Sequence, residues 1–284
     1  IREYEAKYPE IIKPIYQKVN QYSQGVYVSR YNFERAVGKY IALCEGDDYW
    51  TDPKKLQMQV DFLEEHPEYV GTAHNVRVID ETGEDVADTI NPYPTYSQHK
   101  FTIRDTEYMR LPGQSASLVY VNIYRTHNMS DLEEYYHAHG IGDRKLAVYL
   151  TLHGDIYCIQ DTMSIYRYIT TGDTSWSSQM KNKNQSKLLF SYCVDMWNIA
   201  NKKFDMEWIC YIHSLNLFEW SIKIYLLSPT RENREQIKGI IQVALNNPKY
   251  IGVGIMYFIY HPIQTLKRIN TQLQLRHHIS AVTY

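Results

Sequence analysis

The sequence has few cysteines and no long apolar run, and these absences exclude several classes of protein. The four cysteines, Cys44, Cys158, Cys193 and Cys210, are too far apart to form a zinc knuckle. At 284 residues the chain is too long to need a disulfide framework, so we expect reduced thiols in a cytoplasmic protein. No segment approaches the roughly 18 apolar residues that a membrane span requires. The first residues form a charged amphipathic stretch, which is not typical of a signal peptide.

An excess of basic residues is also absent. The chain has 30 Lys and Arg residues against 32 Asp and Glu residues, so we expect no nucleic acid among its partners. Its hydrophobic content of 44% is ordinary for a globular protein. Tyrosine is abundant, at 27 residues, and tyrosine rings both stack on sugars and fill half-buried surfaces. Composition by itself favours the packing explanation.

An acidic cluster is the most informative local feature of the sequence. The apolar run Tyr40–Cys44 predicts a buried strand, and Glu45, Asp47 and Asp48 follow it directly. In an open α/β sheet, ligands bind beyond the carboxyl ends of the strands. Carboxylates at such a place can hold a hard divalent cation, which in turn can hold a diphosphate. The alternative for an isolated group of acidic residues is a solvated turn.

Strand and helix patterns alternate after this point and predict an α/β fold with a mixed sheet flanked by helices. The expected strands cover residues 40–44, 69–79, 116–124, 156–159 and 163–168. A helix is expected from Asp52 to about His66, with Leu56, Val60 and Leu63 on its inner face. This order of elements places the acidic cluster between a strand and a helix.

The second part of the sequence changes in character. Residues 85–110 have weak periodicity and are expected to form a loop, and a helix is expected after Asp143. Beyond residue 178 the apolar stripes are helical and no strand is indicated. We therefore expect two domains, an α/β domain over residues 1–178 and an all-helical C-terminal region over residues 179–284.

Two blocks of this sequence resemble family 2 glycosyltransferases of the GT-A fold. The first block, from Gly38 to Leu63, places a D-x-D type of motif after a strand and continues into a helix of the family's type. The second block comprises Gly142, Asp143 and Met163–Arg167. Together they make the whole α/β domain similar to the family. The family's opening strands, which bind the nucleotide base, have no counterpart here, so we expect a chain truncated at its N-terminus.

The resemblance implies a reaction as well as a fold. It implies an inverting glycosyltransferase that moves a sugar from a nucleotide-diphosphate-sugar donor to a hydroxyl group of a glycan or a lipid-linked acceptor. Similar members of the family act in capsular and other surface polysaccharide synthesis, and we expect that setting here. The implied cofactor is Mn²⁺ or Mg²⁺, which neutralises the charge of the leaving nucleoside diphosphate.

Individual positions take their expected roles from the resemblance. Asp47 matches the metal-binding aspartate, and Glu45 matches the first D-x-D position, which contacts the ribose or the surroundings of the metal. Asp48 is expected to assist through water or to orient the loop. Asp143 matches the catalytic base that takes the acceptor's proton. An aspartate at a helix start also serves as an N-cap, and the two roles are compatible.

Three weaker candidates for donor binding follow from the same resemblance. Gln114 and Ser115 precede a strand at a place where the family has residues near the donor sugar or the acceptor, and a polar strand start is the alternative. Trp176 lies in a small polar loop and is a candidate for a lid over the site. Ile169 stands where the family often has a histidine that assists the metal, so metal binding is expected to depend on Asp47, the diphosphate and water.

Other hypotheses stay open at this point. A non-catalytic module that binds a nucleotide sugar or a carbohydrate is favoured by Ile169 and by the missing strands. A sugar nucleotidyltransferase is less favoured, because that class needs a Gly-rich basic phosphate loop. The apolar segment Tyr250–Tyr260 is followed by Lys267 and Arg268. It is either a buried helix, which we favour, or a peripheral contact with the inner face of the membrane.

Overall fold

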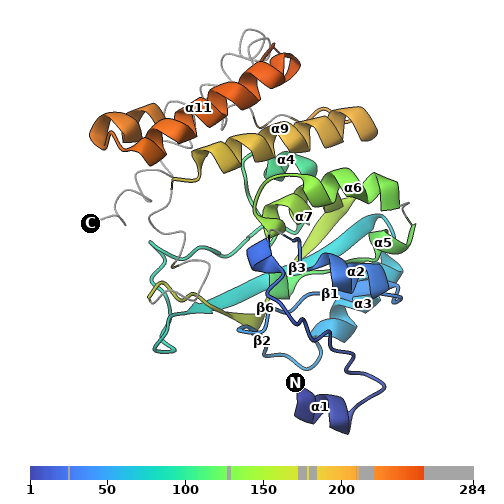
Figure 1. Cartoon of the computed structure of the whole chain (residues 1–284). Coiled ribbons are helices and arrows are strands. Elements are labelled where there is room, and N and C mark those ends of the chain that lie inside the picture. The colour runs from blue at the N-terminus through green and yellow to red at the C-terminus, as the bar shows by residue number, and fades with distance from the viewer. Residues whose placement is uncertain are drawn as a thin grey trace.

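The protein is built around one mixed β-sheet in the part of the chain that the computed structural model describes, residues 1–24, 26–126, 129–171, 178, 184–208, 210 and 221–252. The strand order is β1-β5-β3-β6-β2, and β4 pairs with β6 outside this path. The strands are β1 (Tyr40–Ala42), β2 (Tyr49–Trp50), β3 (Tyr69–Ile79), β4 (Lys100–Phe101), β5 (Val119–Val121) and β6 (Asp155–Arg167). The predicted mixed sheet with flanking helices and a helical C-terminal region is confirmed (Figure 1).

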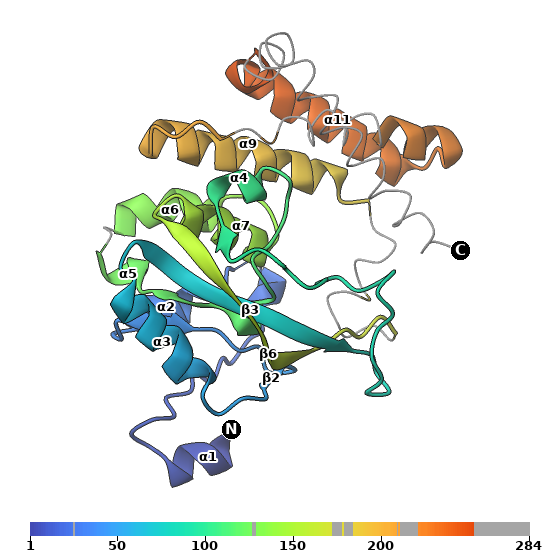
Figure 2. The same ribbon diagram turned by 180° about the vertical axis from the view of Figure 1, so that it is seen from behind.

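Helices cover the sheet on both sides. The helices of the fold, not all of which touch the sheet, include α1 (Arg2–Lys7), η1 (Tyr22–Gln24), α2 (Arg30–Arg35), α3 (Lys55–Glu65), α4 (Ile103–Thr106), η2 (Ser115–Ser117), α5 (Ile123–Thr126), α6 (Met129–His137), α7 (Gly142–Thr151), α9 (Ser186–Lys203) and α11 (Arg231–Asn246). In both views α6 and α7 lie between the sheet and the pair α9 and α11, whereas α3 lies on the opposite side (Figure 1 and Figure 2). Covered on both faces, β3 is buried along most of its length.

The directions of the strands bring the ends of β1 and β6 to one edge of the sheet. β1 runs antiparallel to β5, and β5 runs antiparallel to β3. β3 and β6 run parallel, so β1, β3 and β6 all point the same way. The residues that follow β1 therefore lie at the same edge as Arg167, the last residue of β6. This is the carboxyl edge of the sheet, where ligands bind in open α/β folds.

Strand β6 joins two strands that the sequence predicts separately. It covers both 156–159 and 163–168 except for the last residue, and the predicted strand 69–79 is confirmed as β3. The register between β3 and β6 shifts around His74 and Asn75. Such an irregularity lets a long strand bend without ending it. The polar residues 160–162, between the two predicted strands, therefore belong to the same bent strand.

Helix α3 buries a face that matches its apolar pattern only in part, because Leu63 is buried and Val60 half-buried as predicted but Leu56 is not. Lys55, Gln59 and Leu63 are its buried residues, while Leu56 is 38% exposed. The Lys55 Nζ donates a 2.8 Å hydrogen bond to Gln59 Oε1 and lies 4.5 Å from the centre of the Trp50 ring. These partners compensate the burial of the charge. The prediction of an inner face with Leu56 was wrong, because a satisfied polar pair occupies the buried positions.

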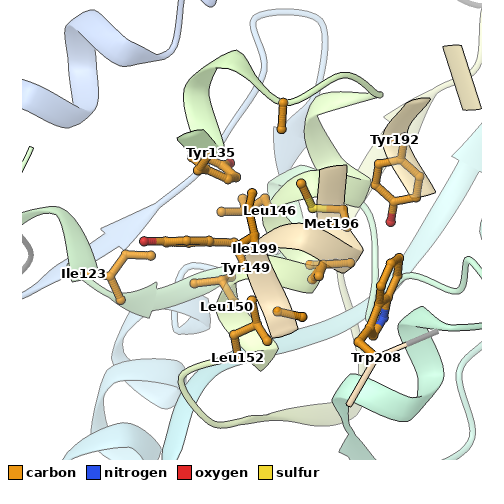
Figure 3. Packing of buried hydrophobic residues seen from close by; sticks show 14 of the residues in the cluster. Ile123, Tyr135, Leu146, Tyr149, Leu150, Leu152, Tyr192, Met196, Ile199 and Trp208 are labelled. Carbon is orange, nitrogen blue, oxygen red and sulfur yellow. The ribbon is translucent and has the colours of Figure 1, made fainter. Parts of the chain in front are cut away.

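One hydrophobic core joins helix α7 to helix α9. Figure 3 shows Leu146 and Leu150 of α7 beside Met196 and Ile199 of α9. The indole of Trp208 is fully buried and hydrogen-bonds to helix α4. This packing crosses residue 178, where the sequence predicts a domain boundary, and the division into two domains stays a prediction.

Lys145 closes the end of helix α6. Its side chain is buried, and its Nζ donates to the carbonyl oxygens of Tyr135 at 3.2 Å, Tyr136 at 3.5 Å and Ala138 at 2.7 Å. The last carbonyls of a helix lack partners within it and carry partial negative charge, so a buried cation suits this place. Burial lowers the pKa of Lys145 to about 8. A single side chain of α7 thus holds α6 in position.

Replacing Lys145 by methionine is expected to lower the free energy of unfolding by about 2–3 kcal/mol, because it leaves buried carbonyls without donors. Chemical denaturation followed by circular dichroism measures the change. Lys238→Met is the matched control, since the one ion pair of Lys238 among the described residues is an exposed one with Glu235, 2.9 Å away. Its expected effect is within about 0.5 kcal/mol. Equal effects of the two substitutions would contradict the helix-closing role.

The apolar segment predicted at 250–260 is described only at its beginning. Tyr250 is buried, and its ring lies 5.6 Å from that of Trp197 and 6.4 Å from that of Phe190, measured between centroids. The remainder, from residue 253, lies outside the described residues. No helix among the described residues is both long enough and apolar enough to traverse a bilayer.

Candidate functional site

The acidic cluster gathers at the carboxyl edge of the sheet. After β1 the chain turns tightly, with the Asp48 amide donating to the Glu45 carbonyl at 3.1 Å. One carboxylate oxygen from each of Glu45, Asp47 and Asp48 lies within 4.8 Å of the others. Asp47 is exposed, whereas Asp48 is only 7% exposed. The turn therefore brings three carboxylates together but leaves them exposed to solvent to different degrees.

Asp48 is the buried member of the cluster and is held from two sides. Its Oδ2 accepts a 2.6 Å hydrogen bond from Gln114 Nε2, and its Oδ1 accepts a 3.2 Å bond from the backbone amide of Arg167. Burial raises the pKa of Asp48, and these two hydrogen bonds oppose the rise. Asp48 thereby links the end of β1 to the end of β6 and to the turn before β5.

The short helix η2 is fixed in place by side chains from several elements. Trp50 Nε1 donates to the Ala116 carbonyl at 2.9 Å, and Gln59 Nε2 donates to the Ser117 carbonyl at 2.9 Å. The Ser117 hydroxyl donates to the Gln114 carbonyl at 2.7 Å. Because these bonds anchor η2 to β2 and α3, the backbone that carries the Gln114 side chain is held in a fixed position.

Glu45 is the member of the cluster with the strongest pKa shift. Surrounding protein atoms, together with the charges of Asp48, Asp47 and Asp143, raise the pKa of Glu45 to about 7. A hydrogen bond from Gln114, at 3.2 Å, lowers it in part. The contribution of Asp143 matters most for function, because it means that the two acidic regions of the sequence lie close enough to interact in the folded protein.

This shift predicts that the contribution of Glu45 to the stability of the metal-free protein falls as the pH rises. The folded protein holds the Glu45 proton up to about pH 7, whereas the unfolded chain releases it near the ordinary value of 4.5. Between these values the folded state binds more protons at Glu45, so this residue's contribution to the free energy of unfolding falls with increasing pH. Melting temperatures measured in chelator between pH 4.5 and 7 test this. Glu45→Gln should flatten the dependence, while Glu65→Gln, a change at an exposed position of α3, should leave it. Identical pH profiles for the two variants would refute the assignment.

Asp143 lies in the first turn of α7, which begins at Gly142. The N-cap position is Ile141, so Asp143 is not the N-cap considered in the sequence analysis, although its Oδ1 accepts a 2.6 Å hydrogen bond from the Arg144 amide. Its Oδ2 accepts a bond from the Tyr93 hydroxyl at 3.3 Å. A half-buried carboxylate held at both oxygens keeps one orientation, which suits a general base.

Tyr93 belongs to this site and was missed in the sequence. The burial of its ring and the charges of Asp143, Tyr166 and Glu45 all raise the pKa of Tyr93. Tyr93 therefore lies close to both acidic regions. It comes from the predicted loop, and the Tyr96 amide, which donates to Asn75 Oδ1 at 2.9 Å, ties that loop to β3. A tyrosine between two prolines in a segment of weak periodicity carries no sequence signal for such a role.

The remaining predicted residues are less informative. Ser115 is half-buried in η2 next to Gln114, and its side chain makes no hydrogen bond to a described residue. Trp176 lies outside the described residues. Ile169 follows the end of β6 by two positions and is half-buried. The structure thus brings together Glu45, Asp47, Asp48, Gln114 and Asp143, and these five roles in catalysis or binding stay predictions.

The cluster is chemically suited to a hard divalent cation. Carboxylate oxygens are the ligands that Mg²⁺ and Mn²⁺ prefer. In the described part of the chain Asp47 makes no hydrogen bond or ion pair, and Glu45 Oε1 accepts none. Both oxygens of Asp48 are occupied by protein donors. Asp47 and Glu45 are therefore the residues that could hold such a cation, and the donor set fits it.

Comparison with known proteins gives relatives without an assigned function. No family model matches the chain. Two uncharacterized proteins from strains of Mycobacterium tuberculosis and one from Mycobacterium bovis are 35% identical to it over 176 residues, which is 59% of this chain and 45% of each relative. The chain thus spans less than half the length of these curated relatives.

The solved structure of S. aureus TarS, residues 1–349, is similar only at a distance. It covers 87% of this chain and 78% of its own, with 11% identity and a TM-score of 0.41. A score this low does not establish a shared fold. What the chain does is therefore inferred from its own residues.

Proposed function

We propose that the protein transfers a sugar from a nucleotide-diphosphate-sugar donor to a hydroxyl group of a glycan or lipid-linked acceptor, with inversion at the anomeric carbon. One observation carries the proposal. Carboxylate oxygens of Glu45, Asp47 and Asp48 converge after β1, and Asp143 of α7, far away in sequence, contributes its charge to the raised pKa of Glu45. This arrangement supports a site that combines the acidic cluster with Asp143. Surface polysaccharide synthesis in the cytoplasm, at the inner face of the membrane, is the proposed setting.

The donor half of the site would use Asp47 and Glu45. They would hold a Mn²⁺ or Mg²⁺ ion, which when bound would supply charge neutralisation for the leaving nucleoside diphosphate. The exposed Arg167, whose charge also lowers the pKa of the neighbouring Asp48, can pair with the same diphosphate. Asp48 itself is occupied by Gln114 and Arg167 and serves to hold the turn.

The acceptor half would use Asp143. Its carboxylate takes the proton of the acceptor hydroxyl while that oxygen bonds to the anomeric carbon of the donor sugar. The bond from the anomeric carbon to the diphosphate oxygen breaks at the same time, and the electron pair leaves with the nucleoside diphosphate. A single displacement of this kind inverts the anomeric centre.

The experiment that tests the proposal measures nucleoside diphosphate release. The purified chain is incubated with a panel of UDP-, GDP- and dTDP-sugars, with Mn²⁺ or with chelator. The proposal predicts that at least one donor releases its nucleoside diphosphate only with the cation. Binding of donors without any release, in the presence or absence of glycan acceptors, would favour the competing hypothesis of a non-catalytic nucleotide-sugar-binding module.

Tyr93→Phe is expected to lower kcat about tenfold, because the Asp143 carboxylate loses the hydroxyl that fixes its Oδ2, and to leave the affinity for Mn²⁺ unchanged. Steady-state kinetics of sugar transfer and a Mn²⁺ titration measure the two effects. Tyr8→Phe is the control, because Tyr8 is an exposed residue at the C-cap of α1 and α1 stands apart from the sheet. An unchanged kcat in Tyr93→Phe would show that Asp143 needs no such support.

A further inference from the structure

We propose that Gln114 is a positioning residue that arranges the acidic cluster for a cation, rather than a contact to the donor sugar. The inference rests on the proposed function, since it concerns the same site. Gln114 is 1% exposed, and its three hydrogen bonds use both ends of its amide. Because the Gln114 side chain is buried and its amide is hydrogen-bonded at both ends, it presents almost no surface for a substrate to contact.

The orientation of the Gln114 amide is fixed by its neighbours. Its Oε1 accepts a 2.6 Å hydrogen bond from the Ala116 amide. Its Nε2 donates to Asp48 Oδ2 at 2.6 Å and to Glu45 Oε2 at 3.2 Å. The reversed orientation would set a carbonyl oxygen against two carboxylates and an NH₂ group against an N–H. Both contacts would be repulsive, so only the observed orientation is stable.

A neutral donor at this place has a specific consequence. Two carboxylates facing each other repel, and a donor between them offsets this repulsion. The Gln114 NH₂ group bridges Glu45 and Asp48 with two N–H bonds but adds no positive charge. A lysine or arginine in this position would instead place a competing positive charge beside the acidic cluster.

The hydrogen bonds from Gln114 also leave the three carboxylates with different numbers of available oxygens. Asp48 has both oxygens occupied, by Gln114 and by the Arg167 amide. Glu45 has its Oε2 held by Gln114, which leaves its Oε1 without a hydrogen bond from a described residue. Asp47 is left without a protein partner among the described residues and is exposed. Gln114 thus leaves Asp47 and one Glu45 oxygen as the available ligands.

The backbone around Gln114 shows that this placement is built in. A Cβ atom on the preceding Gly113 would lie 2.4 Å from Ser117 Oγ and 3.1 Å from the His74 carbonyl oxygen. Only glycine allows so close an approach. Ser117 Oγ in turn donates to the Gln114 carbonyl. Gln114 is therefore seated on a tightly packed turn, as a positioning residue requires.

The test is a Mn²⁺ titration followed by electron paramagnetic resonance, which counts free Mn²⁺ without needing catalysis. Gln114→Ala and the nearly isosteric Gln114→Glu are expected to weaken Mn²⁺ binding about 10- to 100-fold, the range typical of residues that orient metal ligands. Gln114→Asn, with an amide one methylene shorter, is expected to fall between these variants and the unaltered protein. In kinetics the same variants should lower kcat at subsaturating Mn²⁺ and recover most of it when Mn²⁺ is raised.

Asn122→Ala is the matched control for stability. Asn122 is a buried amide that donates two 2.9 Å bonds, to the carbonyls of Ala36 and Gly38, before β1 rather than after it. Its loss should lower the melting temperature but leave the Mn²⁺ affinity unchanged. If Gln114→Ala and Gln114→Glu bind Mn²⁺ as the unaltered protein does, and only the KM for donor rises, the inference is wrong while the proposed function stands. If the unaltered protein binds no Mn²⁺, the cation site of the proposed function fails as well.

Discussion

Asp47→Asn is expected to abolish detectable Mn²⁺ binding and to lower the rate of sugar transfer by at least about a hundredfold. Asp47 is the exposed carboxylate that the described structure leaves without a protein partner, so it is the ligand most available to a cation. Loss of a cation that stabilises a leaving diphosphate removes several kcal/mol of transition-state stabilisation, which is more than a hundredfold in rate. Titration with Mn²⁺ and steady-state kinetics measure the two effects.

The control for Asp47→Asn is the same chemical change at Asp61. Asp61 is exposed on α3 and accepts a hydrogen bond from Gln57 on the same helix. Asp61→Asn should bind Mn²⁺ and transfer sugar as the unaltered protein does. Because Asp47 makes no hydrogen bond within the described residues, neither change should lower the melting temperature in chelator. Full Mn²⁺ affinity in Asp47→Asn would show that the cation binds elsewhere in the protein.

Asp143→Asn is expected to lower kcat by about 10²–10⁴-fold, the range that a positioned general base contributes. An amide cannot accept the proton of the acceptor hydroxyl, but it keeps the shape of the side chain. The KM for donor and the affinity for Mn²⁺ are therefore expected to change little, which is the pattern of a residue that acts in the transition state. Initial rates at varied donor and acceptor concentrations separate these quantities.

A second variant, Asp143→Ala, distinguishes a chemical role of Asp143 from a structural one. Arg144 N and the Tyr93 hydroxyl both donate to the Asp143 carboxylate, so its loss also removes two contacts. Asp143→Asn retains an oxygen for one of these donors, and Asp143→Ala retains none. If both variants lose kcat equally while their melting temperatures differ, the loss comes from chemistry. A kcat that follows the melting temperature would make Asp143 a structural residue.

The local features of the fold were predictable because each depends on a short stretch of sequence. An apolar run followed by acidic residues predicts a strand and an acidic turn, and β1 with Glu45, Asp47 and Asp48 has that form, although β1 is an edge strand in which only Ile41 is buried. The strand 69–79 was predictable in the same way and is β3. Local periodicity reflects burial directly where a strand lies in the middle of a sheet.

Other features depend on contacts between distant residues and could not be predicted. The apolar pattern of α3 suggested Leu56 as a core residue, but Lys55 and Gln59 are buried instead because they bond to each other and Gln59 bonds to η2. Tyr93 reaches Asp143 only through the course of a long loop. The bridging role of Gln114 requires the ends of β1 and β6 to meet at one edge. No spacing in the sequence encodes these three facts.

The most direct test of the central claim compares nucleoside diphosphate release by the unaltered chain, Asp47→Asn and Asp143→Asn over one panel of nucleotide-diphosphate sugars. The proposal predicts release by the unaltered chain that requires Mn²⁺ or Mg²⁺ and loss of that release in Asp47→Asn. It predicts that Asp143→Asn binds cation and donor normally but fails to transfer sugar to an acceptor. Release that is equal in all three proteins, or absent in the unaltered chain with every donor and cation, would contradict the claim.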